Sequence, residues 1–500
     1  MTKKRKASAF DEGGLKAAVR EHVTEISELY REDSIPWVVG YSGGKDSTAV
    51  LQLVWMALQE IEPEERTKPV HVISTDTLVE NPIVSAWVSK SLDTMRQTAE
   101  ALGLPVEPHK LKPKLTDTFW VNLIGRGYPS PRHKFRWCTE RLKINPSNTF
   151  IREVVRASGE ALLVLGSRKS ESSTRARNFK EQDKSRLRDR LRRNAKLPNS
   201  LVYTPIEDWV NDDVWLFLMQ YENPWGYHNK DLLTMYQGAS EDSECPLVVD
   251  TTTPSCGDSR FGCWVCTMVD QDRSMQAMIR NDEEKEWMLP LLDLRNQLGE
   301  RSDRDVRDFR RMNGTVQLFN DKPIPGPYKQ EQREFWLRRV LECQILVQEL
   351  GPESVRNLEL ITLDELEEIR RTWVVEKHEF EDRLPQIYKE MTEEEYPGGP
   401  IDDRSGLGAE EIGLLKEICG DDEIHFQLVR ELLSTERRYR TMARRSGLFA
   451  DLERSLRRGF YDSEEDAIER SRKIREARDN ADRGQYVPEP AQTLLPIFQD

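Results

Sequence analysis

The chain has 500 residues, a length that exceeds one typical hydrophobic core and predicts two or three domains. Hydrophobic residues make up 37% and charged residues 32% of it, which is typical of a globular protein with a strongly charged surface. No apolar run approaches the roughly 18 residues needed to span a membrane, and the basic start MTKKRKASAF lacks the apolar segment of a secretory signal. We therefore expect a cytoplasmic protein that makes no membrane contact.

The formal net charge of -14 disfavours non-specific binding to nucleic acid. The charge is unevenly distributed, however, because residues 167–196 carry far more lysine and arginine than aspartate and glutamate. This segment is either a local basic patch that contacts nucleic acid or a solvated loop with charges of both signs, and its composition suits both.

Strand-like and helix-like segments alternate over the first half of the chain. Apolar runs predict strands at 37–41, 71–75 and 161–167, and the apolar spacing of 47–61 predicts a helix. This alternation predicts an α/β fold with a parallel sheet and helices on both faces. Polar segments follow each predicted strand directly, so we expect them to meet in one cleft at the carboxyl ends of the strands.

The second half of the chain has a different texture. Beyond about residue 275, segments such as 332–350 and 363–391 are charged and have helical apolar spacing, and the Pro/Gly-rich stretch 396–408 resembles a linker. We expect a mainly helical C-terminal region whose polar tail is partly disordered. The expected domains are an N-terminal arm (1–30), an α/β domain (31–275), a helical region (276–395) and a C-terminal helical unit (396–500).

The stretch SGGKDST (42–48), between a predicted strand and a predicted helix, has the chemistry of a phosphate site. It is not a Walker A loop, because Val39 stands where that motif needs glycine and Asp46 stands where it needs Ser or Thr. Two glycines let backbone N–H groups approach an anion, and the positive end of the following helix attracts it. The expected nucleotide contacts are Ser42, Gly43, Gly44, Lys45, Asp46, Ser47 and Thr48. The alternative is an ordinary glycine turn that caps a helix.

Three of the seven cysteines, Cys256, Cys263 and Cys266, lie within one short segment, and Cys245 lies just upstream. In a reducing compartment such a cluster indicates a metal or iron–sulfur site, and the spacing suits tetrahedral zinc equally well. Cys343 is expected in a helical core and Cys419 at a helix end.

Several segments resemble known nucleotide enzymes. SGGKDS after a strand resembles the pyrophosphate loop of the N-type ATP pyrophosphatases, which have the adenine nucleotide α-hydrolase-like fold. This resemblance implies that the loop binds the β,γ-pyrophosphate of ATP while a nucleophile attacks the α-phosphate. STDTLVENP, RWCTERLKINP and GSRKSESSTRA resemble, in the same order, segments of the sulfonucleotide (PAPS) reductases. The nucleotide contacts implied by these segments are Asp76, Glu80, Gly166 and Arg168.

Two departures from the reductases favour another branch of the family. Those enzymes generally have a degraded pyrophosphate loop, which is intact here, and a nucleophilic cysteine in a Glu-Cys-Gly-x-His tail, which has no match here. The loop, the SRFGCWVCT segment and the long helical C-terminal part together resemble the DndC family of DNA phosphorothioation sulfurtransferases. That family implies ATP, Mg²⁺ and a [4Fe–4S] cluster, with DNA, a cysteine desulfurase and the further Dnd-system proteins DndD and DndE as partners.

The resemblance also implies roles for individual residues. Lys45, Asp46, Arg168 and Arg175 would act on the phosphates, with Asp46 holding Mg²⁺. The implied cluster ligands are Cys138, Cys256, Cys263 and Cys266, with Cys245 as the alternative to Cys138. Other functions on the same fold are a tRNA thiolase and a PAPS reductase, and a non-catalytic assembly subunit is a further alternative. His133, flanked by basic residues, is expected to contact phosphate, and His71 is expected to be structural.

Overall fold

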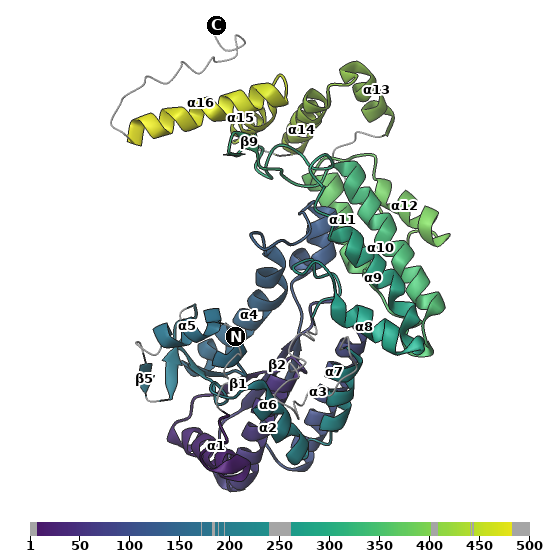
Figure 1. Ribbon diagram of the computed structural model, residues 1–500. Coiled ribbons are helices and arrows are strands. Elements are labelled where there is room, and N and C mark those ends of the chain that lie inside the picture. Colours follow the sequence, from purple (N-terminus) through teal and green to yellow (C-terminus); the bar gives the residue numbers. More distant parts are fainter. Residues whose placement is uncertain are drawn as a thin grey trace, which may run out of the picture. The chain divides into compact units, whose positions relative to one another are not determined.

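The computed structural model describes most of the chain, namely residues 8–171, 173–182, 186–188, 190–194, 196–239, 262–401, 409–440, 442 and 445–482. The chain divides into two compact units, each built from several segments (Figure 1). Unit 1 comprises Met1–Phe119, Pro131–Gly299 and Leu346–Leu360, and unit 2 comprises Trp120–Ser130, Glu300–Ile345 and Ile361–Asp500. The domain boundaries expected from the sequence stay predictions.

Unit 1 is built on a seven-stranded sheet with the strand order β3-β2-β1-β4-β7-β6-β5. The first five strands in this order run parallel, and β6 pairs antiparallel with both β7 and β5. The strands are β1 (Trp37–Gly40), β2 (Val70–Thr75), β3 (Val106–Leu111), β4 (Ala161–Val164), β5 (Arg186–Arg188), β6 (Leu191–Arg193) and β7 (Ser200–Tyr203). The expected mostly parallel sheet is confirmed. The antiparallel edge was not expected, because β5 and β6 are too short and arginine-rich to show an apolar run.

Side chains of the central strand β1 alternate between the two faces of the sheet. Trp37 and Val39 join one large core with α1 (Gly14–Glu32), α2 (Lys45–Glu60) and other helices, whereas Val38 packs with Ile151 and Val154 of α4 (Asn145–Ser158). Helices therefore cover both faces, as the sequence predicted (Figure 1).

Further helices complete unit 1: α3 (Pro82–Ala101), α5 (Ser173–Gln182), α6 (Asn211–Gln220), α7 (Asn229–Gly238), α8 (Arg273–Asn281) and α9 (Leu289–Leu298). The residues that follow position 200 are rich in aromatic side chains, and these contribute to the large core. Trp209, Trp215, Phe217 and Trp225 are all at most 1% exposed. These four rings therefore pack the interior and offer no face to a nucleic-acid base.

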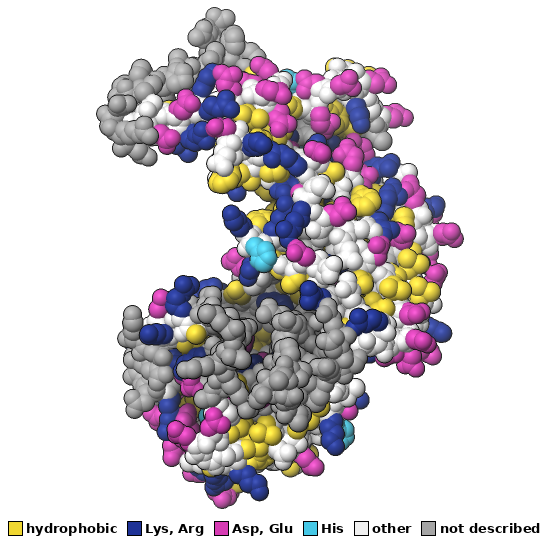
Figure 2. Space-filling model, in the orientation of Figure 1, with side chains coloured by type: hydrophobic (Ala, Val, Ile, Leu, Met, Phe, Trp, Pro, Cys, Tyr) yellow, Lys and Arg dark blue, Asp and Glu magenta, His cyan; other side chains and the backbone are white. Residues whose placement is uncertain are grey.

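The described part of unit 2 is mainly helical, as expected. Its elements are α11 (Leu363–Arg371), α12 (Arg383–Thr392), α13 (Ala409–Cys419), α14 (Glu423–Arg440), α15 (Leu448–Gly459), α16 (Glu464–Asp482) and the short pair β8 (Leu318–Phe319) and β9 (Lys322–Pro323), while α10 (Gln330–Leu350) has residues in both units. A small core of Val374, Phe380, Ile412 and Phe426 joins several of these helices. Acidic and basic side chains are interspersed over their surface (Figure 2). None of the helices among the described residues is long and apolar enough to cross a membrane.

Candidate nucleotide site and thiol cluster

The loop between β1 and α2 is folded tightly against the start of α2. Ser47 Oγ accepts a hydrogen bond from the Ser42 N–H at 3.1 Å and donates one to the Gly44 carbonyl at 3.0 Å. Gly43 has a φ of +72°, a conformation that glycine adopts without strain. The helix begins at Lys45, so its unpaired N–H groups and positive end lie at the loop, as an anion site requires.

Gly43→Ala is expected to lower the free energy of unfolding by about 2 kcal/mol or more, because a left-handed backbone and a steric clash both oppose the side chain. An added Cβ would lie 2.5 Å from Cγ2 of Val88, a β-branched residue on α3 whose rotamer cannot easily adjust. The control is Gly103→Ala, where φ is +58° but no atom lies within 4 Å, so only the backbone cost remains. Urea unfolding of both variants measures the difference, and equal losses would show that the contact with Val88 relaxes.

Three charged residues form an ion-pair cluster beside the loop. Arg168 Nε lies 2.8 Å from Asp46 Oδ1, although the two groups are not aligned as a hydrogen bond, and Lys45 Nζ lies 3.5 Å from Asp46 Oδ2. Their side chains are 5%, 24% and 15% exposed for Arg168, Asp46 and Lys45. Burial lowers the pKa of Lys45, partly offset by Asp46. Two cations thus flank the Asp46 carboxylate at the loop, and Glu171, which accepts a 3.0 Å hydrogen bond from the Arg168 N–H, is a further acidic neighbour.

Gly166 makes this cluster possible, because it allows the segment after β4 to approach the first turn of α2. A Cβ on Gly166 would lie 2.8 Å from the Asp46 carbonyl oxygen and 3.1 Å from the Ser47 nitrogen. The backbone of the segment after β4 therefore runs directly against the loop, and it brings Arg168 to Asp46.

Tyr236 is a neighbour of the loop that the sequence pattern did not single out. It lies on α7, and its hydroxyl accepts a 3.4 Å hydrogen bond from the Lys45 backbone N–H. The Lys45 ammonium lies 5.2 Å from the centroid of the same ring, within cation–π range. Burial raises the pKa of the Tyr236 phenol, so the ring stays neutral beside the lysine. An isolated tyrosine in a helix carries no motif, so only the packing reveals it.

The acidic residues after β2 have partners of their own. Asp76 Oδ1 accepts a 2.9 Å hydrogen bond from the Leu78 N–H, and Asp76 Oδ2 lies 3.0 Å from Lys110 Nζ. Burial raises the pKa of Glu80, while Lys143, at 3.9 Å, lowers it. Both acids thus lie at the carboxyl end of β2, next to the strand that leads into the loop.

Three of the predicted cluster ligands lie close together at this same end of the sheet. Cys263 and Cys266 form a tight turn in which the Cys266 N–H donates to the Cys263 carbonyl at 3.0 Å. That turn is held to the segment after β2, since the Trp264 N–H donates to the Val79 carbonyl at 2.9 Å. Burial, together with the nearby thiols of Cys263 and Cys266, raises the pKa of Cys138 to about 11.

A basic side chain and a hydroxyl group lie next to the Cys263 thiol. Cys263 is the largest cause of the raised pKa of Lys143. Lys143 in turn lowers the pKa of the Cys263 thiol, which burial raises. Thr77 Oγ1 lies 3.3 Å from Cys263 Sγ. Burial raises the pKa of the Cys138 and Cys263 thiols, and a bound cation would favour their thiolate forms, so this donor set fits a thiolate-ligated metal or iron–sulfur cluster.

Arg295 is a second residue that the sequence pattern missed. It is fully buried, and its guanidinium donates to three backbone carbonyls: to that of Cys266 at 3.0 Å, to that of Asp270 at 2.9 Å and to that of Val269. The planar guanidinium has five N–H donors and can bind several carbonyls of such a turn at once, which a lysine ammonium could not do in the same geometry. Arg295 therefore fixes the segment that follows the two cysteines.

Three of the predicted site residues cannot be placed. Cys256 and its neighbour Cys245 lie outside the described residues, and so does the side chain of Arg175 on α5. His133 is exposed, and its Nδ1 lies 3.4 Å from an Arg136 guanidinium nitrogen. Cys343 is buried in α10, as expected, and Cys419 ends α13.

Residues 36–268 match the phosphoadenosine phosphosulfate (PAPS) reductase domain family. This stretch of the chain is similar to that domain. It contains the loop, the ion-pair cluster and the three neighbouring thiols, all within unit 1.

Individual proteins similar to this chain are distant. An uncharacterized protein of Methanocaldococcus jannaschii is 26% identical over 215 residues, which are 43% of this chain and 38% of that protein. The chain thus spans well under half the length of this relative. Among solved structures, PAPS reductase from Candida auris matches 43% of this chain and 89% of its own at 14% identity and a TM-score of 0.27. The U34-tRNA thiolase NcsA from Methanococcus maripaludis, solved with its [4Fe–4S] cluster, matches 58% of this chain and 80% of its own at 15% identity and a TM-score of 0.29.

Proposed function

We propose that the chain is an ATP pyrophosphatase-type sulfurtransferase of the DndC kind. It would activate a DNA backbone phosphate with ATP and replace a non-bridging oxygen by sulfur. One observation carries the proposal: an intact Gly-Gly-Lys-Asp loop, with Arg168 paired to Asp46, lies at the same end of the sheet as three neighbouring thiols. A reductase acting on an already activated nucleotide has no need of this loop.

In the first step, the loop and Lys45 hold the β- and γ-phosphates of ATP. An oxygen of the DNA phosphate attacks the α-phosphorus, the bond from the α-phosphorus to the bridging oxygen breaks, and pyrophosphate leaves with that electron pair. Arg168, which is 5% exposed and fixed by its contact with Asp46, neutralises charge that builds on the phosphates. A Mg²⁺ ion arriving with ATP would compete with Lys45 and Arg168 for the Asp46 carboxylate.

In the second step, sulfur at the oxidation level of sulfide attacks the adenylated DNA phosphorus, and AMP leaves with the original DNA oxygen. The sulfur would come from a cysteine desulfurase persulfide released by a thiol reductant. A [4Fe–4S] cluster held by Cys138, Cys263 and Cys266, with Cys256 as fourth ligand, would bind and position that sulfur. DndD and DndE are proposed as further partners.

The test uses the full chain purified without oxygen. We expect it to contain iron and to release pyrophosphate from ATP, with AMP as the other nucleotide product, at a rate that DNA increases. Iron content, visible absorbance and pyrophosphate are measured with DNA, with tRNA and with neither. Hydrolysis to ADP and phosphate would contradict the loop assignment. Stimulation by tRNA alone would favour a tRNA thiolase, and reduction of PAPS without ATP cleavage would favour a reductase.

A further inference from the structure

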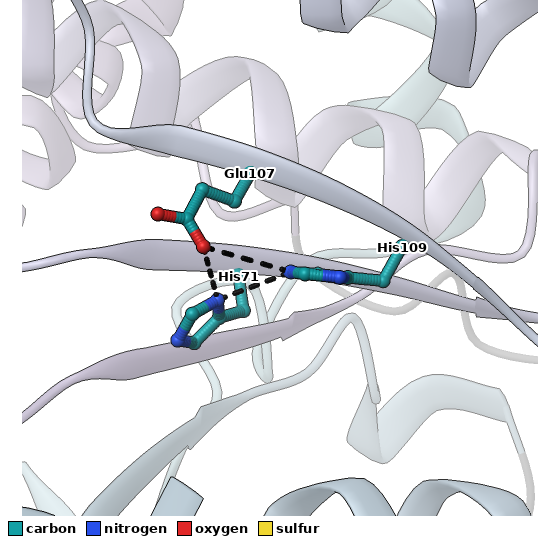
Figure 3. Close-up of side chains that lie close together, drawn as sticks. All are labelled: His71, Glu107 and His109. Atoms are coloured by element: carbon teal, nitrogen blue, oxygen red, sulfur yellow. Dashed lines mark hydrogen bonds and ion pairs between the residues drawn. The ribbon is translucent and has the colours of Figure 1, made fainter.

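A second group of side chains that can bind a metal lies away from the loop, on β2 and β3, the two neighbouring strands at one edge of the sheet. His71 is the second residue of β2, and Glu107 is the second residue of the edge strand β3. The parallel register places His71 opposite Glu107 and Ile73 opposite His109. Because side chains two residues apart on a strand share a face, Glu107 and His109 both project toward His71 (Figure 3).

The three ligand atoms form a compact triangle. His71 Nδ1 lies 3.0 Å from Glu107 Oε2 and 3.1 Å from His109 Nε2, and His109 Nε2 lies 3.8 Å from Glu107 Oε2. Ligands bound to tetrahedral zinc at about 2.0–2.1 Å are separated from one another by about 3.3 Å. The observed separations lie on both sides of this value, so a single ion placed between the three atoms would reach all of them.

Hydrogen bonds within the triangle can join only two of its three atoms at a time. A neutral imidazole carries one proton, so His71 Nδ1 can donate either to Glu107 or to His109, but not to both. The remaining side, at 3.8 Å, is too long for a hydrogen bond. A cation bound between the three atoms would instead take a lone pair from each imidazole and from the carboxylate, and would so engage all three at once.

The surroundings hold the ligands in place and leave one side open. The ring of Phe150, on α4, lies 5.5 Å from the His71 ring and 4.7 Å from the His109 ring. The side chains of His71, His109 and Glu107 are 15%, 32% and 54% exposed, so solvent reaches the group from the Glu107 side.

We propose that His71, Glu107 and His109 bind a divalent transition-metal ion, with Zn²⁺ as the expected ion and water at its fourth position. Two imidazoles and one carboxylate are a donor set that zinc accepts, and they differ from the soft thiols of the cysteine cluster. The bound ion would tie the edge strand β3 to β2. This proposal does not depend on the proposed function, because the three residues lie outside the nucleotide loop.

The test measures zinc binding to the full, anaerobically purified chain by titration calorimetry, with X-ray absorption at the zinc edge to identify the ligands. We expect one zinc ion with nitrogen and oxygen neighbours at about 2.0–2.1 Å, whereas zinc on the thiols would have sulfur neighbours at about 2.3 Å. His109→Asn is expected to raise the dissociation constant at least about 100-fold, since changes to outer-shell residues alone cost 10–100-fold. His228→Asn, at an exposed histidine that precedes α7, is the matched control and should bind zinc as the unmodified chain does.

Glu107→Gln is expected to weaken zinc binding as His109→Asn does. Because Glu107 is the most exposed of the three ligands, this substitution should leave folding unchanged. Added zinc should raise the melting temperature of the unmodified chain and of His228→Asn, but not that of His109→Asn or Glu107→Gln. Sulfur neighbours alone in the absorption spectrum would overturn the proposal. Equal zinc affinity in Glu107→Gln and in the unmodified chain would overturn it as well.

Discussion

Lys45→Ala is expected to slow pyrophosphate release from ATP by about 100-fold or more, which is the size of effect seen when one charge-stabilising donor is removed from an active site. Lys45 stands at the first position of α2 and is 15% exposed, and its ammonium lies beside the Asp46 carboxylate and the Tyr236 ring. Burial disfavours the charged form of Lys45 and lowers its pKa, and a bound phosphate would stabilise that charged form.

The matched control for this prediction is Lys90→Ala, at an exposed lysine of the helix α3. Both variants should keep the iron content and the circular dichroism spectrum of the unmodified chain, because Lys45 takes no part in the thiol cluster. Pyrophosphate release by Lys45→Ala at the rate of Lys90→Ala would show that the loop does not bind the reacting nucleotide.

Cys263→Ser is expected to remove nearly all iron from the anaerobically purified protein, together with its visible absorbance. Cys263 is central to the thiol group, since it contacts Thr77 Oγ1 and is the neighbour with the largest influence on Lys143. A serine hydroxyl does not ionise at neutral pH and is a poor ligand for the soft iron–sulfur centre. Iron and acid-labile sulfide are measured per chain.

Cys419→Ser, at the partly buried end of α13, is the control and should retain full iron. Parallel substitutions of Cys138, Cys245 and Cys256 identify the remaining ligands, and we expect the Cys245 variant alone to keep the cluster. A protein that contains zinc in place of iron, lost equally in Cys263→Ser, would make the thiol cluster a structural zinc site and would remove the sulfur-positioning role.

Much of the site follows from local patterns in the sequence. The apolar run at Trp37–Gly40 and the two glycines behind it predict a strand, a tight turn and a helix, because each depends on neighbouring residues alone. Since parallel strands place their carboxyl ends at one edge, the convergence of Lys45, Glu80 and Arg168 on that edge was also predictable. The structure adds the 2.8 Å separation between Arg168 Nε and Asp46 Oδ1, which no sequence pattern gives.

Other features depend on packing between distant segments. Tyr236 reaches Lys45 from a helix nearly two hundred positions away, and Arg295 reaches the Cys266 carbonyl from beyond the PAPS reductase-like domain. Neither residue belongs to a motif, because a side chain that contacts a site through tertiary packing needs no fixed spacing from it. The short strands β5 and β6 were missed for a related reason: pairing with β7, rather than their own composition, makes them strands.

The sequence by itself determined the α/β fold, the glycine loop before α2 and the pairing of Cys263 with Cys266, since these rest on periodicity, glycine chemistry and spacing, whereas Cys138 was assigned from the resemblance to the reductases. The tertiary structure alone decided that His71 faces Glu107 and His109. The strand β3 was not predicted, and the relation among the three residues depends on the register of β3 against β2, which long-range hydrogen bonds fix. A shift of that register by one residue would turn Glu107 and His109 to the opposite face and separate them from His71.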